Sequence, residues 1–241
     1  MNLHLQLRKY LRSYPEWKLA PPRVQLRRAL QKVGSEYGGY FLDPSGIGPD
    51  AVVYSLGIGE DISFDLSLIH QYGVTVHAFD PTPRVKKWLA SQKLPDEFCF
   101  HDTGIADFDG EGIFYLPPRP DHVSHSVVPA RQFSRESIPV PMMRLGTAME
   151  RLGHSRIGLM KMDIEGGEYG VLEDLVRERI PVEQILVEFH HRFSSIGTAK
   201  TRRMLSMLED YGMRICYVCP RVEVFTLVRS TQSGEWAAAA G

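Results

Sequence analysis

Short runs of apolar, often β-branched residues alternate along the chain with segments in which apolar residues recur every three or four positions. Such runs are typical of strands buried on both faces, and the intervening spacing is typical of amphipathic helices. From residue 51 onward the alternation predicts strands at residues 51–56, 74–79, 98–101, 157–162 and 184–189. Strands regularly separated by helices form right-handed βαβ units, so we expect a mostly parallel sheet covered by helices on both faces.

The C-terminal part of the pattern predicts a different connection. Residues 213–218 and 222–228 are both apolar runs, separated by only a short segment that contains Pro220, which favours an antiparallel hairpin. Together with the earlier runs, this predicts an α/β fold: a doubly wound, mostly parallel seven-stranded sheet with a C-terminal antiparallel hairpin. Residues 112–116 form a further apolar run that we interpret as an extra strand.

Residues 1–48 precede this pattern and carry scattered apolar positions among many arginines. Val24, Leu30 and Val33 are loosely helix-spaced after two prolines, which predicts an N-terminal helical extension packed on the main domain. The main domain is expected to span residues 49–230. Residues 231–241, which end in four alanines and a glycine, are expected to form a disordered tail.

Charge and composition narrow the class of protein. The 241 residues include 28 Lys and Arg against 29 Asp and Glu, so the net charge of -1 provides no overall positive field to hold a nucleic acid. No stretch approaches the roughly 18 consecutive apolar residues that a membrane-spanning helix needs. Three cysteines are too few for a disulfide framework, and the first residues do not form a secretory signal, so we expect a cytoplasmic protein.

Two glycines, Gly57 and Gly59, follow the first strand of the main domain. Ligands of an open parallel sheet bind beyond the carboxyl ends of its strands, so this turn is a candidate cofactor loop, although two glycines also suit an ordinary turn. Asp80 ends the second strand, where an acid can accept hydrogen bonds from a nucleotide ribose; the alternative is a cap on the next helix, a position that Thr82 already suits. Asp102 ends the third strand, either as a contact for an adenine amino group or in a solvated turn.

The densest group of acids follows the fourth strand. Asp163, Glu165 and Glu168 fall within six residues, just before a predicted helix. Such crowding is unfavourable unless a helix N-terminus, a cation or a hydrogen-bonded ligand offsets it. Glu168 also suits a helix start, whereas we interpret Asp163 and Glu165 as ligand-binding residues rather than as a solvated acidic turn.

These residues carry a family resemblance. Residues 161–172 resemble the K-x-D-x-E-G-x-E-x-x-x-L signature of the FkbM-type methyltransferases, and residues 54–63 are similar to the glycine-rich loop of a methyltransferase-like branch of that family. The similarity extends over residues 51–193 in the correct order. It implies the Rossmann-like class I fold that binds S-adenosylmethionine (SAM), with an antiparallel seventh strand.

The resemblance also implies which residues contact SAM. Asp163 would lie beside the sulfonium end and face the acceptor. Two positions depart from the common class I pattern, because Ser55 stands where many of these enzymes place an acid and Asp61 where a third glycine often lies. The residues expected to contact SAM are Gly57, Gly59, Glu60, Asp61, Asp80, Asp102 and Asp163.

Methyl transfer to an alcohol requires that the hydroxyl proton leave, and a base of suitable pKa assists this. His190 follows the fifth strand, beside the strand of Asp163, and is the first candidate base; the alternative is a histidine with an ordinary backbone partner. His125, in the long connection before the fourth strand, is the second candidate. Glu165 and Glu188 are expected to contact the acceptor.

A divalent metal is a further option, since Asp163, Glu188 and His190 could together hold one and acidify a hydroxyl. Their spacing does not require a metal, so SAM is the expected cofactor.

The sequence therefore predicts a SAM-dependent methyltransferase that acts on a hydroxyl of a sugar, a glycan precursor or a natural product. The expected partner is a small-molecule or glycan acceptor, with no nucleic acid and no membrane span. Two rivals remain. One is an NAD-dependent oxidoreductase, whose G-x-G-x-x-G motif requires a third glycine at the position of Ile62. A non-catalytic SAM- or nucleotide-binding scaffold module would have no use for the acidic cluster.

Overall fold

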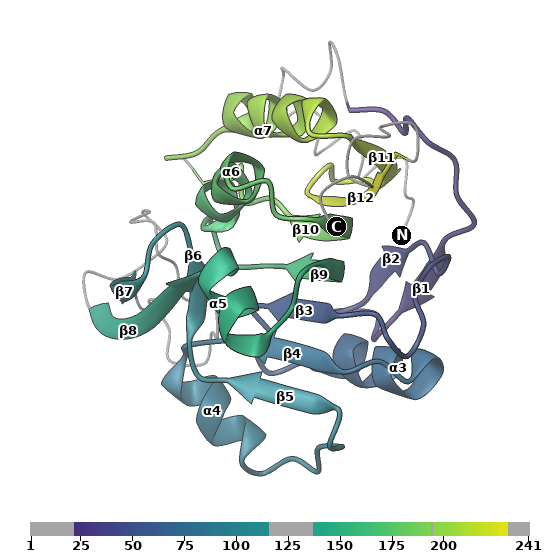
Figure 1. The fold of residues 1–241 in the computed structure, drawn as a ribbon. Coiled ribbons are helices and arrows are strands. Elements are labelled where there is room, and N and C mark those ends of the chain that lie inside the picture. Colours follow the sequence, from purple (N-terminus) through teal and green to yellow (C-terminus); the bar gives the residue numbers. More distant parts are fainter. Residues whose placement is uncertain (1–21, 116–136, 194, 231–241) are drawn as a thin grey trace.

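A seven-stranded sheet forms the centre of the computed structural model, which describes residues 22–115, 137–193 and 195–230 (Figure 1). The strand order is β11-β12-β10-β9-β3-β4-β5. Neighbours from β10 to β5 are parallel, whereas β12 is antiparallel to both β10 and β11. The predicted doubly wound sheet with its C-terminal antiparallel hairpin is thus confirmed. In chain order the strands are β3 (Val53–Leu56), β4 (Val76–Phe79), β5 (Phe98–His101), β9 (Ile157–Met162), β10 (Val182–Glu188), β11 (Met213–Val218) and β12 (Val224–Arg229).

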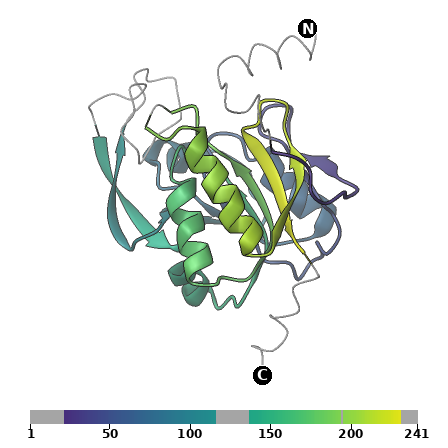
Figure 2. The same cartoon turned by 90° about the horizontal axis from the view of Figure 1, so that it is seen from above.

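Helices cover both faces of this sheet, as the near-continuous apolar strands predicted. One face packs against α3 and α4, and the other against α5, α6 and α7. Figure 2 shows α6 and α7 side by side along their face. Within the described residues, no helix combines the length and the apolar character needed to cross a membrane. The helices are α3 (Ser63–Tyr72), α4 (Pro83–Leu89), α5 (Leu145–Leu152), α6 (Glu168–Arg177) and α7 (Thr198–Asp210).

The sheet reverses its direction of growth at its centre. The chain runs outward from β3 through β4 to β5, and then crosses back to place β9 on the other side of β3. In an open parallel sheet, ligands bind at the carboxyl ends of the two strands that flank such a switch point. The ends of β3 and β9 are therefore where a site is expected.

The N-terminal segment differs from the prediction. Residues 22–30 contain no helix, and β1 (Gln31–Val33) pairs with β2 (Tyr40–Leu42) as an antiparallel hairpin. Gly34 ends β1 with φ +94°, a left-handed conformation that stops a regular helix or strand and suits glycine. The expected helix is therefore wrong for residues 22–35, and residues 1–21 lie outside the described part.

A small second sheet, ordered β6-β8-β7, lies between β5 and α5 in the chain. β7 (Gly110–Tyr115) confirms the extra strand, but β6 (Gly104–Ala106) and β8 (Ser137–Arg144) were not predicted. Pro139 and Pro141 argue against a strand at β8, because proline cannot donate to a ladder. Both prolines are tolerated because β6 pairs only with the last three residues of β8. The edge of β8 that faces β6 is therefore unpaired at the prolines.

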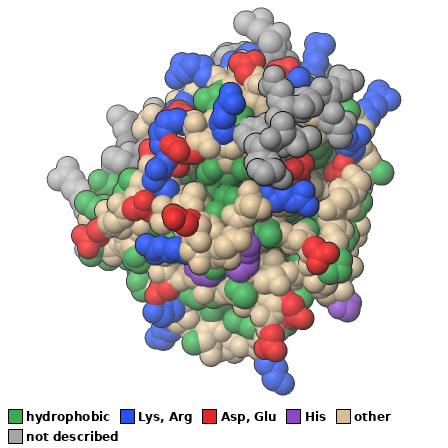
Figure 3. All heavy atoms as spheres, viewed as in Figure 1, with side chains coloured by type: hydrophobic (Ala, Val, Ile, Leu, Met, Phe, Trp, Pro, Cys, Tyr) green, Lys and Arg blue, Asp and Glu red, His purple; other side chains and the backbone are tan. Residues whose placement is uncertain are grey.

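A histidine cluster lies on the α5 side of the sheet. His77 Nδ1 is 3.1 Å from His101 Nε2, and the Tyr54 hydroxyl is 2.9 Å from His154 Nδ1. The His77 ring also meets the His154 ring at a centroid distance of 4.8 Å. Histidine side chains reach the surface in the middle of this face in Figure 3. Burial and the nearby histidines lower the pKa of His77 to about 4, and burial also lowers the pKa of His101 and of His154.

Because these pKa values are lowered in the folded state, stability is expected to fall at acidic pH. Between pH 6.5 and about 4 the unfolded chain takes up protons that the folded cluster does not, so protonation favours unfolding. With allowance for solvent screening, we expect the free energy of unfolding to be about 1–2 kcal/mol lower at pH 5 than at pH 7. Chemical denaturation at the two pH values measures this, and His77→Gln should flatten the dependence. His70→Gln, at an exposed position of α3, is the control; an equal pH dependence in both variants would contradict the assignment.

Candidate functional site

A cavity of about 610 Å³ lies at the carboxyl ends of β3, β4, β9 and β10, where the switch point was expected. Its wall combines the glycine loop after β3, the acidic run after β9, the end of β10 and the turn between β1 and β2. This volume is within the range of roughly 300–1,000 Å³ that is typical of small-molecule sites.

The glycine loop and the acidic run touch directly. Gly57 has φ +72°, and a Cβ at this position would lie 1.9 Å from the carbonyl oxygen of Asp163. Gly57 therefore allows the ends of β3 and β9 to approach each other in a way that no other residue would. Gly59 has φ +57° and faces open space, so the left-handed backbone of the turn alone accounts for a glycine at this position.

Asp80 holds the glycine loop in place. Its Oδ2 accepts hydrogen bonds from the backbone N–H groups of Ile58 (3.1 Å) and Gly59 (3.2 Å), and its Oδ1 accepts one from Thr82 N–H (2.9 Å). Thr82 is the N-cap residue of α4, as predicted, but its side chain makes no capping hydrogen bond. Asp80 lines the cavity, and its contact with a ribose stays a prediction.

Glu60 and Asp61, both expected near SAM, also line the cavity. Glu60 forms an ion pair with Arg84 at 2.7 Å. Asp61 accepts hydrogen bonds from Ser63 N–H at 2.9 Å and from the Ser35 hydroxyl at 2.7 Å, so it ties the glycine loop to the turn between β1 and β2.

Asp102 is not brought to this cavity. Its carboxylate pairs with Lys86, and its side chain is 40% exposed. Gly104 and Asp107, a few residues further on, line the cavity instead. This placement does not favour the expected contact between Asp102 and adenine. His125 lies outside the described residues.

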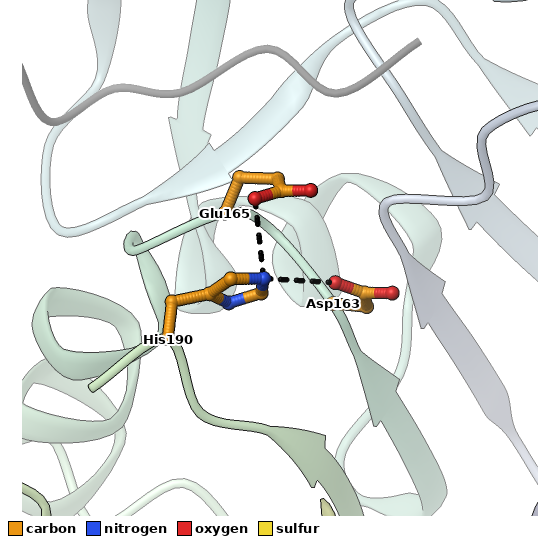
Figure 4. Close-up of side chains that lie close together, drawn as sticks. All are labelled: Asp163, Glu165 and His190. Atoms are coloured by element: carbon orange, nitrogen blue, oxygen red, sulfur yellow. Dashed lines mark ion pairs between the residues drawn. The ribbon is translucent and has the colours of Figure 1, made fainter. Parts of the chain in front are cut away.

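Three acids surround His190, as Figure 4 shows for two of them. The histidine is 1% exposed; its Nδ1 lies 2.8 Å from Glu168 Oε1, and its Nε2 lies 3.2 Å from Glu165 Oε2 and 3.7 Å from Asp163 Oδ1. Glu168 is fully buried and also accepts backbone hydrogen bonds from Ile164 and Gly166. Glu168 thus fixes the orientation of the imidazole, which turns Nε2 toward the other two acids.

Glu165 adopts a left-handed backbone conformation with φ +50°, which is unfavourable for a residue with a side chain. The strained turn carries its carboxylate to His190.

The electrostatics of this group change the expected roles. Burial alone would lower the pKa of His190, but Glu168, Glu165 and Asp163 outweigh burial and raise it well above its ordinary value. Burial also raises the pKa of Asp163. Burial and the charge of Asp163 raise the pKa of Glu188 to about 7. The raised pKa of His190 favours its charged form, and the pKa of about 7 lets Glu188 titrate near neutral pH.

One ligand atom each of Asp163, Glu165 and His190 lies within 4.8 Å of the others, which is close enough to hold a metal ion. Glu188, expected in such a group, is not part of it. The same contacts are satisfied by a proton on His190 Nε2, since 3.2 Å to Glu165 is a hydrogen-bond distance.

Several residues of the cavity wall were not singled out from the sequence. Lys161 and Arg192 were detectable as charged residues beside the acidic run and the end of β10. Tyr40 lies in β2, Asp65 lies inside α3 and Asp107 follows β6, where no local signal separates them from ordinary turn or helix residues. Their role depends on which elements the fold brings together.

Comparisons with known proteins agree with the resemblance. Residues 50–215 match the family described as the methyltransferase FkbM domain. The chain is 30% identical over 141 residues to the rat "Probable methyltransferase-like protein 24" and 29% identical to the human one. Each match covers 57% of this chain and 32% of the relative, so the chain matches about a third of the length of these relatives. A crystal structure of an FkbM methyltransferase from Methylobacillus flagellatus KT superposes with a TM-score of 0.46 and 14% identity, covering 75% of this chain and 44% of that one.

Proposed function

The chain belongs to the FkbM methyltransferase family, and on this premise we propose that it transfers a methyl group from SAM to a hydroxyl group of a small-molecule or glycan acceptor. The observation that carries the proposal is the direct contact of the glycine loop with the acidic run inside one cavity. The backbone of the glycine loop and the carboxylates of the acidic run therefore face the same cavity.

The residues present fit a cationic donor. Nine Asp and Glu residues line the cavity against four Lys and Arg, so its wall carries more acidic groups than its own cations offset. When bound, SAM supplies a methyl group on a positively charged sulfur. We propose that Gly57 and Gly59 approach this donor with their backbone, and that Asp163 stabilises the positive charge near the acceptor.

We propose Glu188 as the base that takes the hydroxyl proton. It lines the cavity, and a pKa of about 7 suits a group that must accept a proton at neutral pH. A charged His190 has no free lone pair, so its electrostatics disfavour the role of base. We propose instead that His190 positions Glu165 and Asp163.

The chemistry of the wall supports a hydroxyl-bearing acceptor. Ionised carboxylates accept hydrogen bonds only, and hydroxyl groups are donors that Glu165 and Glu188 can hold in a fixed orientation. A sugar or a polyhydroxylated natural product offers several such donors.

The test is a methylation assay with a panel of sugars, sugar nucleotides and polyols, in which formation of S-adenosylhomocysteine is measured by mass spectrometry. A thermal shift with S-adenosylhomocysteine alone should raise the unfolding temperature, because a ligand that binds only the folded state stabilises it. We expect turnover to survive EDTA; a strict requirement for added Mn²⁺ or Mg²⁺ would instead assign a metal to Asp163, Glu165 and His190. Stabilisation by NADH without any response to SAM would overturn the proposal.

A further inference from the structure

Asp65 is a buried acid on the cavity wall that has no part in the function proposed above. It is the third residue of α3 and is only 2% exposed. Its Oδ1 has no hydrogen-bond partner among the described residues. Burial raises the pKa of Asp65, and the charge of Lys161 and the nearby Ser55 hydroxyl lower it without outweighing burial.

The cationic side chain near Asp65 already interacts with other groups. Lys161 donates from Nζ to the carbonyl oxygen of Gly57, and this Nζ lies 5.6 Å from the ring centroid of Tyr40. Its charge lowers the pKa of Asp65, but no ion pair joins the two in the described part of the chain. The buried Ser55 hydroxyl lies beside this carboxyl and lowers the pKa of Asp65, but not enough to outweigh burial.

The position of this acid is informative. Ser55 ends β3 where many class I enzymes place an acid, and Asp65 presents a carboxylate to the Ser55 side chain from the facing helix. Asp163 and Glu188 also line this cavity, so a second group of carboxylates borders the same space. SAM carries two positive groups, a sulfonium and an α-ammonium.

We propose that Asp65 binds the α-ammonium group in the methionine part of SAM. This inference rests on the proposed function, because it names the residue that recognises one end of the same donor. An ammonium group has three N–H donors and no acceptor, so it complements a carboxylate with a spare oxygen. Asp65 thereby replaces the strand-end acid that Ser55 lacks.

The competing explanation is structural. Asp65 lies in the first turn of α3, where an acid interacts favourably with the helix dipole. On that explanation Asp65→Asn would lower the thermal midpoint of the ligand-free protein and weaken every ligand of the glycine loop equally. If Asp65 instead binds the ligand, the ligand-free variant keeps the thermal midpoint of the wild type, because the substitution removes a charge that burial disfavours.

The experiment measures binding of two ligands to wild type and to Asp65→Asn by calorimetry. S-adenosylhomocysteine retains the amino-acid part, whereas 5′-methylthioadenosine lacks it. We expect the affinity for S-adenosylhomocysteine to fall by roughly 10- to 100-fold, as for a lost hydrogen bond to a charged group, and the affinity for 5′-methylthioadenosine to change less than about threefold. Asp96→Asn, the same chemical change at an exposed position outside the cavity lining, should alter neither.

A second measurement changes the ligand, and its first comparison needs only the wild-type protein. A deaminated analogue of S-adenosylhomocysteine should bind wild type with a comparable loss of affinity, and Asp65→Asn should no longer distinguish the analogue from the parent ligand. An equal loss for both ligands, or no loss for S-adenosylhomocysteine, would overturn the role of Asp65. If wild type bound no S-adenosylhomocysteine at all, the proposed function itself would fail, which is a distinct result.

Discussion

Replacing Asp163 by Asn is expected to lower kcat by at least about a hundredfold while the protein stays folded. In the proposed reaction a neutral hydroxyl attacks, so positive charge moves toward the acceptor, and a carboxylate beside the cavity stabilises this charge more in the transition state than in the ground state. The fold should survive, because burial, and to a smaller extent Glu165 and Glu168, raise the pKa of Asp163, so the neutral Asn avoids the cost of a buried charge.

Initial rates at saturating SAM and acceptor measure the effect, and thermal unfolding verifies the fold. Asp96→Asn provides the matched control, since this acid is exposed and lies outside the cavity lining. A folded Asp163→Asn protein with unchanged kcat would remove this residue from the mechanism.

Glu188→Gln is expected to lower kcat by about 10²- to 10⁴-fold and to abolish one limb of the pH profile. Only the deprotonated carboxylate can accept the hydroxyl proton, so the wild-type rate should rise with increasing pH through about 7 and then level off. The Gln variant should show a rate that is low and nearly independent of pH across this range.

The matched control is Glu183→Gln, which makes the same change at an exposed position on the same strand, β10. Rates measured from pH 5.5 to 9 on all three proteins distinguish the alternatives. If Glu188→Gln kept the wild-type pH profile, another group would be the base, and His190 would return as the candidate.

Much of the fold was predictable because its signals are local. The strands β3, β4, β9 and β10 are short apolar runs, and burial on both faces of a parallel sheet requires such composition. β8 escaped prediction because Pro139 and Pro141 are acceptable only where the neighbouring β6 is short. The helix expected before residue 35 failed because three loosely spaced apolar residues fit several structures, and pairing with β2 decided between them.

The candidate site was predictable only in part. Gly57, Asp163 and His190 follow strands whose carboxyl ends meet, so the sequence order already brought them together. The charge state of His190 was not predictable, because it depends on Glu168 reaching back from the first turn of α6. The position of Asp65 on the cavity wall was not predictable either, because nothing in the sequence distinguishes this carboxylate from others in an ordinary helix.

The bond between Ser35 and Asp61 has a consequence for defining the functional unit. The family match covers residues 50–215, yet the hairpin that carries Ser35 and Tyr40 precedes this segment, and β12 follows it. A fragment trimmed to the matched boundaries would lose one wall of the cavity and the strand that pairs with β10. Residues on both sides of the recognised region therefore belong to the smallest piece that can be expected to work.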